Sequence, residues 1–278
     1  MAELNNEQVL ALKYIKEGFN IFLTGPAGCG KSFTIEKIVE QCTKYNKSLK
    51  ITATTGAAAS NIKGTTLHSW AGIGVPSKDT SIKLLQRKIM KNTKLKRKWR
   101  QTDVLIIDEV SMLDYEFMIT LEKLARYVRN SEKVFGGIQI VLAGDFFQLP
   151  PVKPGLIRYI FEEKIWSELI HQIVSLTIVY RQKDDEYKEI LMKIRNNTHT
   201  QDDIDRLNAE KTGGYNGGIV PTKLFCTRKD VDKMNANELA KLEEELVICP
   251  SKDFYENDAT KRQYEKQWQF KHIVNLKI

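Results

Sequence analysis

One short motif, Gly25-Pro-Ala-Gly-Cys-Gly-Lys31-Ser32, constrains this chain more than any other feature of its sequence. An apolar run at 20–24 precedes it and a helical pattern over about 31–45 follows it, which is the strand–loop–helix context of a phosphate-binding loop. The glycines allow backbone N–H groups to surround a β-phosphate, and the helix amino terminus adds its positive end. Lys31 is expected to reach the β- and γ-phosphates, and the Ser32 hydroxyl to ligate Mg²⁺. The sequence therefore predicts an ATP-binding loop made of Gly25, Pro26, Ala27, Gly28, Cys29, Gly30, Lys31, Ser32 and Phe33.

A second motif, Leu105-Ile-Ile-Asp108-Glu109, ends an apolar run with two adjacent acids. Asp108 is placed to bind Mg²⁺, usually through water, and Glu109 to polarise the attacking water as a general base. The alternative is a strand that merely ends in two solvated acids, but the phosphate-binding loop upstream disfavours it. The pair therefore predicts hydrolysis of ATP, not binding alone.

Short apolar runs alternate with helical patterns along the first part of the chain. We expect strands at 20–24, 50–54, 104–107 and 138–142, with a small-residue turn at 55–59. Short buried strands that alternate with helices favour a parallel sheet covered on both faces, the α/β class. Further along, the pattern predicts a helix at 185–195, a strand at 223–226 and a helix at 229–242.

The positive charge is concentrated in one segment. Residues 83–100 contain nine Lys or Arg and no Asp or Glu, whereas the whole chain carries a formal charge of +8. This segment interrupts the strand–helix alternation, so we expect residues 76–101 to be an insert. It is either a solvated, flexible loop or a surface that neutralises phosphates, and its concentration in an otherwise near-neutral chain favours phosphate binding.

The remaining composition is that of a soluble intracellular protein. The four cysteines are widely spaced and form no CxxC pair, which favours a reducing compartment. The amino-terminal residues have neither the apolar core of a signal peptide nor the composition of a transit peptide. No apolar run approaches the length of a membrane span. The compartment itself is open, and a nucleus or a viral replication site fits equally.

Several motifs in order carry a resemblance to a known family. They are Leu4-Asn-Asn-Glu-Gln8, TGPAGCGKS, Thr52-Ala-Thr-Thr-Gly-Ala-Ala-Ala59, Gly64-Thr-Thr-Leu-His-Ser-Trp70, IIDEVSML, Gly144-Asp-Phe-Phe-Gln-Leu-Pro-Pro-Val152 and Val179-Tyr-Arg181-Gln182. Together they resemble the PIF-type helicases of superfamily 1, relatives of the RecD motor, over Leu4 to about Leu242. The resemblance implies a RecA-like P-loop NTPase that uses ATP and Mg²⁺.

The resemblance also implies roles for single residues. Gln8 resembles the glutamine that reads the adenine edge, Gln148 the γ-phosphate sensor, and Arg181 an arginine that reaches the γ-phosphate. In such helicases the stretches that hold Thr54, Thr55, Gly56, Thr66 and His68 line the single-strand path, and the basic insert, with Lys94 and Arg97, is a wedge beside it. Each has a structural alternative: Gln8 as a surface amide, Arg181 as an ion-pair partner, and His68 as a core residue. Phe146 and Phe147 are expected to pack more readily than to stack on bases.

The resemblance implies a domain plan and a function. We expect a first RecA-like domain at 1–174 and the beginning of a second at 175–278, which lacks the later motifs of the family and is therefore incomplete. The expected function is a 5′-to-3′ DNA helicase motor, acting as a monomer on single-stranded, fork or junction DNA in replication, recombination or repair. Backbone contacts leave RNA open as a second substrate. The alternative is an ATP-switched single-strand-binding protein without productive unwinding.

Overall fold

The computed structural model describes residues 3–74, 80–151, 157–209, 222–242, 246–248 and 275–277. The chain divides into two compact units, 1–209 and 210–278. The first unit runs past residue 174, the expected domain boundary, through two further helices; the domain assignment itself stays a prediction. None of the helices in these described ranges is long and apolar enough to cross a bilayer.

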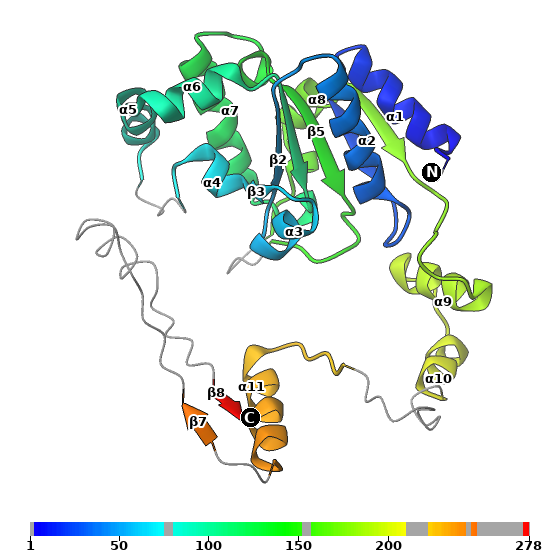
Figure 1. Cartoon of the computed structure of the whole chain (residues 1–278). Coiled ribbons are helices and arrows are strands. Elements are labelled where there is room, and N and C mark those ends of the chain that lie inside the picture. The colour runs from blue at the N-terminus through cyan, green and yellow to red at the C-terminus, as the bar shows by residue number, and fades with distance from the viewer. Residues whose placement is uncertain are drawn as a thin grey trace. The chain divides into compact units, whose positions relative to one another are not determined.

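A parallel sheet organises the first unit (Figure 1). Its strand order is β3-β2-β4-β5-β1-β6, and each neighbouring pair is parallel. The strands are β1 (Ile21–Thr24), β2 (Leu49–Ala53), β3 (Thr65–Thr66), β4 (Val104–Asp108), β5 (Gln139–Gly144) and β6 (Gln172–Ser175). Because the carboxyl ends of parallel strands share one edge, the residues after β1, β2, β4 and β5 meet there. The predicted parallel sheet is confirmed.

Helices cover both faces of this sheet, whereas α9 and α10, which follow β6, lie apart from those faces (Figure 1). In chain order the helices of the first unit are α1 (Asn6–Lys16), α2 (Lys31–Lys44), α3 (Gly56–Asn61), α4 (Leu67–Ala71), α5 (Ile82–Lys91), α6 (Thr93–Gln101), α7 (Tyr115–Arg129), α8 (Lys164–Leu169), α9 (Asp185–Arg195) and α10 (Gln201–Ala209). The short 3₁₀ turns are η1 (Val110–Met112), η2 (Val134–Gly137) and η3 (Ile160–Glu162).

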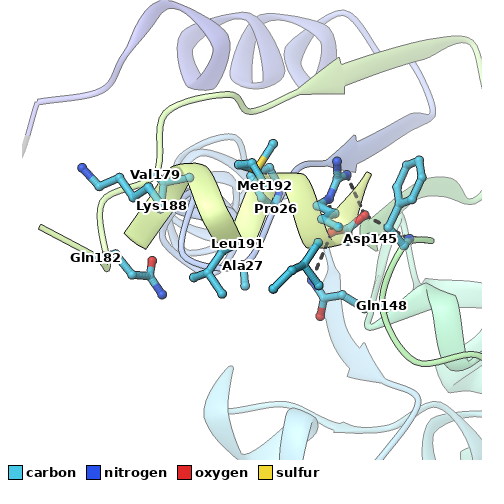
Figure 2. A pocket seen from close by; sticks show the side chains of 12 residues that line it. Pro26, Ala27, Asp145, Gln148, Val179, Gln182, Lys188, Leu191 and Met192 are labelled. Carbon is cyan, nitrogen blue, oxygen red and sulfur yellow. Dashed lines mark hydrogen bonds and ion pairs between the residues drawn. The ribbon is translucent and has the colours of Figure 1, made fainter. Parts of the chain in front are cut away.

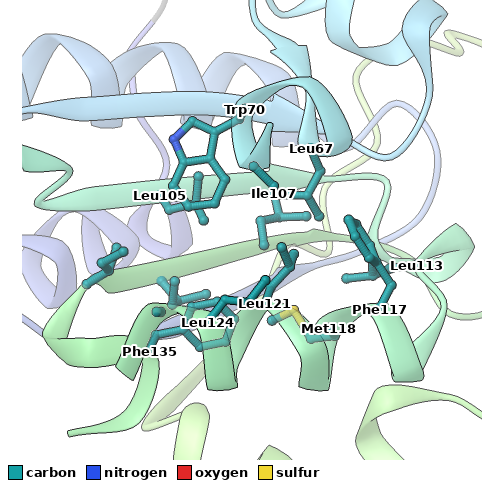
Figure 3. Packing of buried hydrophobic residues seen from close by; sticks show 14 of the residues in the cluster. Leu67, Trp70, Leu105, Ile107, Leu113, Phe117, Met118, Leu121, Leu124 and Phe135 are labelled. Carbon is teal, nitrogen blue, oxygen red and sulfur yellow. The ribbon is translucent and has the colours of Figure 1, made fainter. Parts of the chain in front are cut away.

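Alternation along the central strands builds the two cores. In β4, Val104 and Ile106 pack with α1 and α2, whereas Leu105 and Ile107 pack with α4 and α7. All four side chains are fully buried. Figure 3 shows the second of these cores, where Leu105 and Ile107 meet Leu121 and neighbouring side chains of α7. A strand buried on both faces holds its carboxyl end in a fixed position, and Asp108 occupies that end of β4.

The basic insert is folded against the core. Helices α5 and α6 both contact α7, and their apolar side chains, such as Ile89 and Trp99, are fully buried. The Trp99 indole N–H donates to the Ala71 carbonyl at 3.1 Å, and its ring lies 4.5 Å from that of Trp70. The flexible-loop alternative for the insert is therefore wrong over residues 80–101, where the cations form the outer face of two amphipathic helices; the beginning of the insert, 76–79, lies outside the described residues.

Two other local predictions differ from the structure. Residues 55–59, expected to be a turn, instead cap and begin α3 (Gly56–Asn61), because the Thr55 hydroxyl accepts a hydrogen bond from the Ala58 amide and three successive alanines follow Gly56. The expected strand at 223–226 is irregular, and Leu224 and Phe225 are exposed there. The rest of the second unit that the structure describes is α11 (Arg228–Ala240), as expected, and an antiparallel pair, β7 (Leu246–Ile248) with β8 (Asn275–Lys277).

Candidate active site

The loop between β1 and α2 has the backbone of a phosphate cradle. Gly25, Gly28 and Gly30 all have positive φ, at 145°, 81° and 89°. A Cβ at Gly28 would lie 2.6 Å from the Arg181 Cβ, and one at Gly25 would lie 2.4 Å from the Leu176 carbonyl oxygen. Both positions therefore require glycine, because another residue would be strained and would also collide. Lys31 begins α2, and its Nζ donates to the carbonyls of Gly25 at 2.7 Å and Pro26 at 3.0 Å.

The segment after β6 is fastened to this loop from the other side. The Tyr180 amide donates to the Gly28 carbonyl at 2.9 Å, and the Leu176 amide to the Thr24 carbonyl at 2.8 Å. The Glu7 carboxylate of α1 accepts from both the amide and the hydroxyl of Thr177. Arg181 is thereby held beside the phosphate-binding loop although the two are far apart in sequence.

Gln8 is buried and has a structural role in its own helix. Its side-chain oxygen accepts the Asn5 amide at 3.1 Å while the Asn5 side chain accepts the Gln8 amide, which closes a capping box on α1. Its Nε2 lies 3.0 Å from where a Cβ on Gly30 would be. Only 2% of Gln8 is exposed, so the surface-amide alternative is wrong; adenine contact stays a prediction.

The two acids at the end of β4 have different surroundings. Asp108 is buried, accepts the Glu109 amide at 2.9 Å, and has its pKa raised to about 6 by that burial. Glu109 lines the pocket described below and has a φ of 54°, a left-handed conformation that is uncommon outside glycine. The Thr54 hydroxyl donates to the Glu109 carbonyl at 3.0 Å and so ties this residue to the end of β2.

An open pocket of about 450 Å³ brings the phosphate-binding and hydrolytic candidates together. Its lining is Ala27, Gly28, Gly30, Lys31, Ser32, Phe33, Glu109, Gln148, Tyr180 and Arg181. These residues come from four separate segments of the chain, and all but Tyr180 are predicted from the sequence. Gly25 and Cys29 do not line this pocket and instead belong to the packed side of the loop. Cys29 is fully buried, with its Sγ 3.8 Å from the Lys31 Nζ.

Gln148 is tied to α9 through a buried ion pair. Its side-chain amide donates to Asp145 Oδ2 at 3.3 Å. Arg195 of α9 donates to both oxygens of that carboxylate, at 2.9 Å each. Burial acts to raise the pKa of Asp145, but the Arg195 guanidinium, the Phe147 amide and the Gln148 side chain together hold that pKa below its usual range. Figure 2 shows Asp145 and Gln148 in an apolar pocket that Leu191 of α9 shares with Pro26 and Ala27.

The Mg²⁺ that accompanies such a nucleotide site fits two of these residues. Asp108 is a buried carboxylate whose hydrogen bond comes from one backbone amide, so a nearby cation would offset its desolvation. Ser32 lies at the amino terminus of α2, where its hydroxyl is exposed. These two side chains would hold the ion, and the ion would neutralise charge on the β- and γ-phosphates.

The predicted nucleic-acid residues fall into two separate places. Thr55 caps α3 and Thr66 caps α4, and both helices follow the carboxyl ends of the paired strands β2 and β3. His68 is half-buried and stacks on Phe117 with ring centroids 4.0 Å apart. Lys94 and Arg97, by contrast, lie on α6 and line a hollow with Lys50, near the amino end of β2. The threonines and the two cations of the insert therefore lie in separate places, and their contacts with nucleic acid stay predictions.

Three site residues were missed from the sequence. Tyr180 lies beside the predicted Arg181, and its aromatic ring next to a phosphate-binding residue was the available signal. Asp145 follows Gly144 in the same motif as Gln148, and the resemblance assigned a role in that motif to Gln148 alone. Nothing local indicates Arg195, because its partner is 50 positions away in the sequence.

The two phenylalanines of the Gly144–Val152 motif have different surroundings. Phe146 packs among the aromatic side chains Phe22, Tyr159, Phe161 and Trp166. Phe147 is 67% exposed, with the Arg195 guanidinium over its ring.

Comparison with known proteins gives one consistent answer. The family described as PIF1-like helicase matches residues 3–205. The ATP-dependent DNA helicase RRM3 of Saccharomyces cerevisiae is 41% identical over 250 residues, which is 87% of this chain and 34% of that protein. The ATP-dependent DNA helicase PIF1 of Candida albicans is 37% identical over 264 residues, or 90% of this chain and 29% of that protein. The chain thus spans about a third of the length of these relatives.

Solved structures of PIF1 helicases also resemble this chain. The crystal structure of Pif1 helicase from Candida albicans superposes with a TM-score of 0.89 at 36% identity, over 100% of this chain and 64% of that one. Pif1 helicase from Bacteroides, in complex with ADP-AlF3 and single-stranded DNA, gives 0.73 at 29% identity, over 92% and 62%. The RecA-like architecture expected from the sequence is confirmed. Motifs, family match and fold coincide over most of the chain, which therefore belongs to the PIF1-like helicases.

Proposed function

We propose that this chain forms the ATP-hydrolysing motor site of a 5′-to-3′ DNA helicase. One observation carries the proposal: Lys31, Glu109, Gln148 and Arg181, from four separate segments, line a single pocket. That combination supplies a phosphate ligand, a general base, a nucleotide sensor and a second phosphate-binding cation. Polarity and work in replication, recombination, repair or telomere maintenance rest on family membership.

The proposed chemistry follows from the position of each side chain. Glu109 orients and deprotonates the water that attacks the γ-phosphate, and its strained backbone is fixed by the bond from Thr54. Lys31 and Arg181 balance the negative charge that spreads over the phosphoryl oxygens. Gln148 senses the γ-phosphate and, through Asp145 and Arg195, is linked to α9.

Single-stranded DNA is the proposed track, and it lies over Thr54, Thr55, Gly56, Thr66 and His68. The hydroxyls and small residues there suit close approach of a sugar–phosphate backbone. Thr54 lies on this proposed track and donates to the Glu109 carbonyl, so it would link DNA binding to hydrolysis directly. The relative from Bacteroides has been solved bound to single-stranded DNA, which supports this partner. A monomer in an intracellular compartment is the proposed state.

Strand displacement tests the proposal. Partial duplexes with either a 5′ or a 3′ single-stranded overhang are mixed with the chain and ATP. We expect displacement from the 5′ overhang alone, with no displacement by Lys31→Ala. Binding without any displacement would favour the alternative, an ATP-switched single-strand-binding protein, and displacement from the 3′ overhang would contradict the assigned polarity.

A further inference from the structure

A hollow of about 260 Å³ lies between α6 and the amino end of β2. Its lining is strongly cationic and contains no acidic side chain. The lining residues are Ser48, Lys50, Lys94, Arg97, Lys98 and Gln101. Such a concentration of positive charge around one concave surface is unfavourable unless an anion shares it.

The cations of the hollow are not neutralised by the protein around them. Within the ranges that the structure describes, none of Lys50, Lys94, Arg97 and Lys98 forms an ion pair. Asp103 is near, but its carboxylate accepts the Ser48 amide at 2.8 Å. Burial, and then repulsion from Lys50, lower the pKa of Lys98. An anion in the hollow would relieve that repulsion.

The positive surface continues beyond the hollow. Lys50 also lines a neighbouring hollow of about 390 Å³, to which Lys47 and Lys63 contribute and which again has no acid in its lining. The two hollows share Lys50, so cations run from α6 across β2 to the end of α3. This is an extended track for a polyanion and not a single-ion pocket.

The hollow is separate from the proposed single-strand path. Lys50 lies near the start of β2, and Thr54 follows its last residue. Four residues of extended strand span roughly 13 Å. In Figure 1, α6 lies toward one end of β2 and α3 toward the other. A strand that follows Thr54, Thr55 and Thr66 therefore leaves the α6 hollow free, although the neighbouring hollow reaches Thr65.

We propose that this cationic hollow is a second nucleic-acid site that binds the phosphodiester backbone of a duplex. Lys, Arg, Ser and Gln are the side chains that donate to phosphates. The lining of the α6 hollow has no aromatic ring, so it offers no platform for unpaired bases. A duplex keeps the faces of its bases stacked inside and presents two rows of phosphates on its outer surface. The site would position the double-stranded arm of a substrate; that use rests on the proposed function, whereas duplex binding itself does not.

A matched pair of double variants on the same insert tests the site. Lys94→Gln with Arg97→Gln removes two charges from the hollow. Lys83→Gln with Arg87→Gln removes the same two residue types from α5, where they line neither hollow. All four side chains are exposed, so both variants should fold, which circular dichroism checks. Affinity for a labelled blunt DNA duplex is measured by anisotropy over a salt series.

We expect the hollow variant to bind the duplex about tenfold more weakly at low salt, with the slope of log affinity against log salt reduced by about two. The α5 variant should keep the wild-type affinity and slope. Equal losses in both variants would mean diffuse attraction by net charge, and no loss in either would mean no site; each overturns the proposal.

Two further measurements distinguish duplex binding from single-strand binding and from the proposed motor function. Affinity for a single-stranded oligonucleotide should be nearly unchanged in the hollow variant; an equal loss there would place the hollow on the single-strand path and overturn the duplex assignment. ATP hydrolysis is recorded in parallel. Selective loss of duplex binding by a chain without DNA-stimulated hydrolysis would support the hollow while the proposed motor function fails.

Discussion

Gly28 is one of the two positions at which the phosphate-binding loop has no room for a side chain. Its φ of 81° and the 2.6 Å approach of a Cβ to Arg181 both oppose a side chain. We therefore expect Gly28→Ala to weaken ATP binding by about tenfold or more, because the loop and the Tyr180–Arg181 segment must separate. Binding of a fluorescent ATP analogue measures this. The control is Gly18→Ala, which shares a positive φ of 86° but meets nothing within 4 Å; equal affinities for the two variants would contradict the account.

His68 makes the folded state sensitive to acid. Burial against Phe117 lowers the pKa of this imidazole, so the unfolded chain binds the proton more readily than the folded one. The contribution to stability is complete above the ordinary pKa of about 6.5 and is lost as the pH falls below that value toward the folded pKa. Urea unfolding at several pH values should therefore show a steeper acid loss for the wild type than for His68→Gln. The exposed His199→Gln should match the wild type; an unchanged pH slope in His68→Gln would count against this assignment.

At the scale of elements, the Asp145–Arg195 pair joins the loop after β5 to α9. Asp145 is 1% exposed, so Arg195→Met would leave this buried carboxylate without its cation and should lower the free energy of unfolding by about 3 kcal/mol. The comparison is Arg206→Met, whose pair with Glu186 is more than half exposed on both sides and should cost less than about 1 kcal/mol. Urea denaturation followed by tryptophan fluorescence gives both values. Similar losses would mean that the buried pair does not hold α9 in place.

Elements also show which kinds of pattern can be predicted from sequence. Strands β4 and β5 contain the apolar runs 104–107 and 140–143, which suit a sheet buried on both faces. The insert was harder, because nine cations conceal the helical spacing of Leu85, Ile89, Leu95 and Trp99, whose burial depends on α7. Helix α3 is too short to show a period, and its Thr55 cap becomes clear only from the structure. Residues 223–226 have no pairing strand among the described residues, and their apolar composition alone was not enough to form a strand.

For the whole molecule, the nucleotide site could be predicted almost completely because its residues belong to local motifs with a fixed order. The nucleic-acid contacts could not, because their grouping depends on which end of β2 each element reaches. Lys94 and Arg97 were predicted on an insert beside the path of Thr54 and Thr66, and the sequence does not indicate how far from that path they lie. Asp145 and Arg195 form a pair across 50 residues, which no local pattern records.

The central claim is that one pocket, shared by Lys31, Glu109, Gln148 and Arg181, hydrolyses ATP in response to single-stranded DNA. The most direct measurement is the steady-state ATPase rate with and without a single-stranded oligonucleotide. It is made for the wild type, for Glu109→Gln, and for Glu36→Gln, an exposed glutamate on α2 that does not line the pocket. We expect DNA to stimulate hydrolysis in the wild type and in Glu36→Gln, and the Glu109→Gln rate to fall about a hundredfold or more because the general base is lost. A Glu109→Gln rate equal to that of the wild type, or a rate that DNA leaves unchanged, would contradict the account.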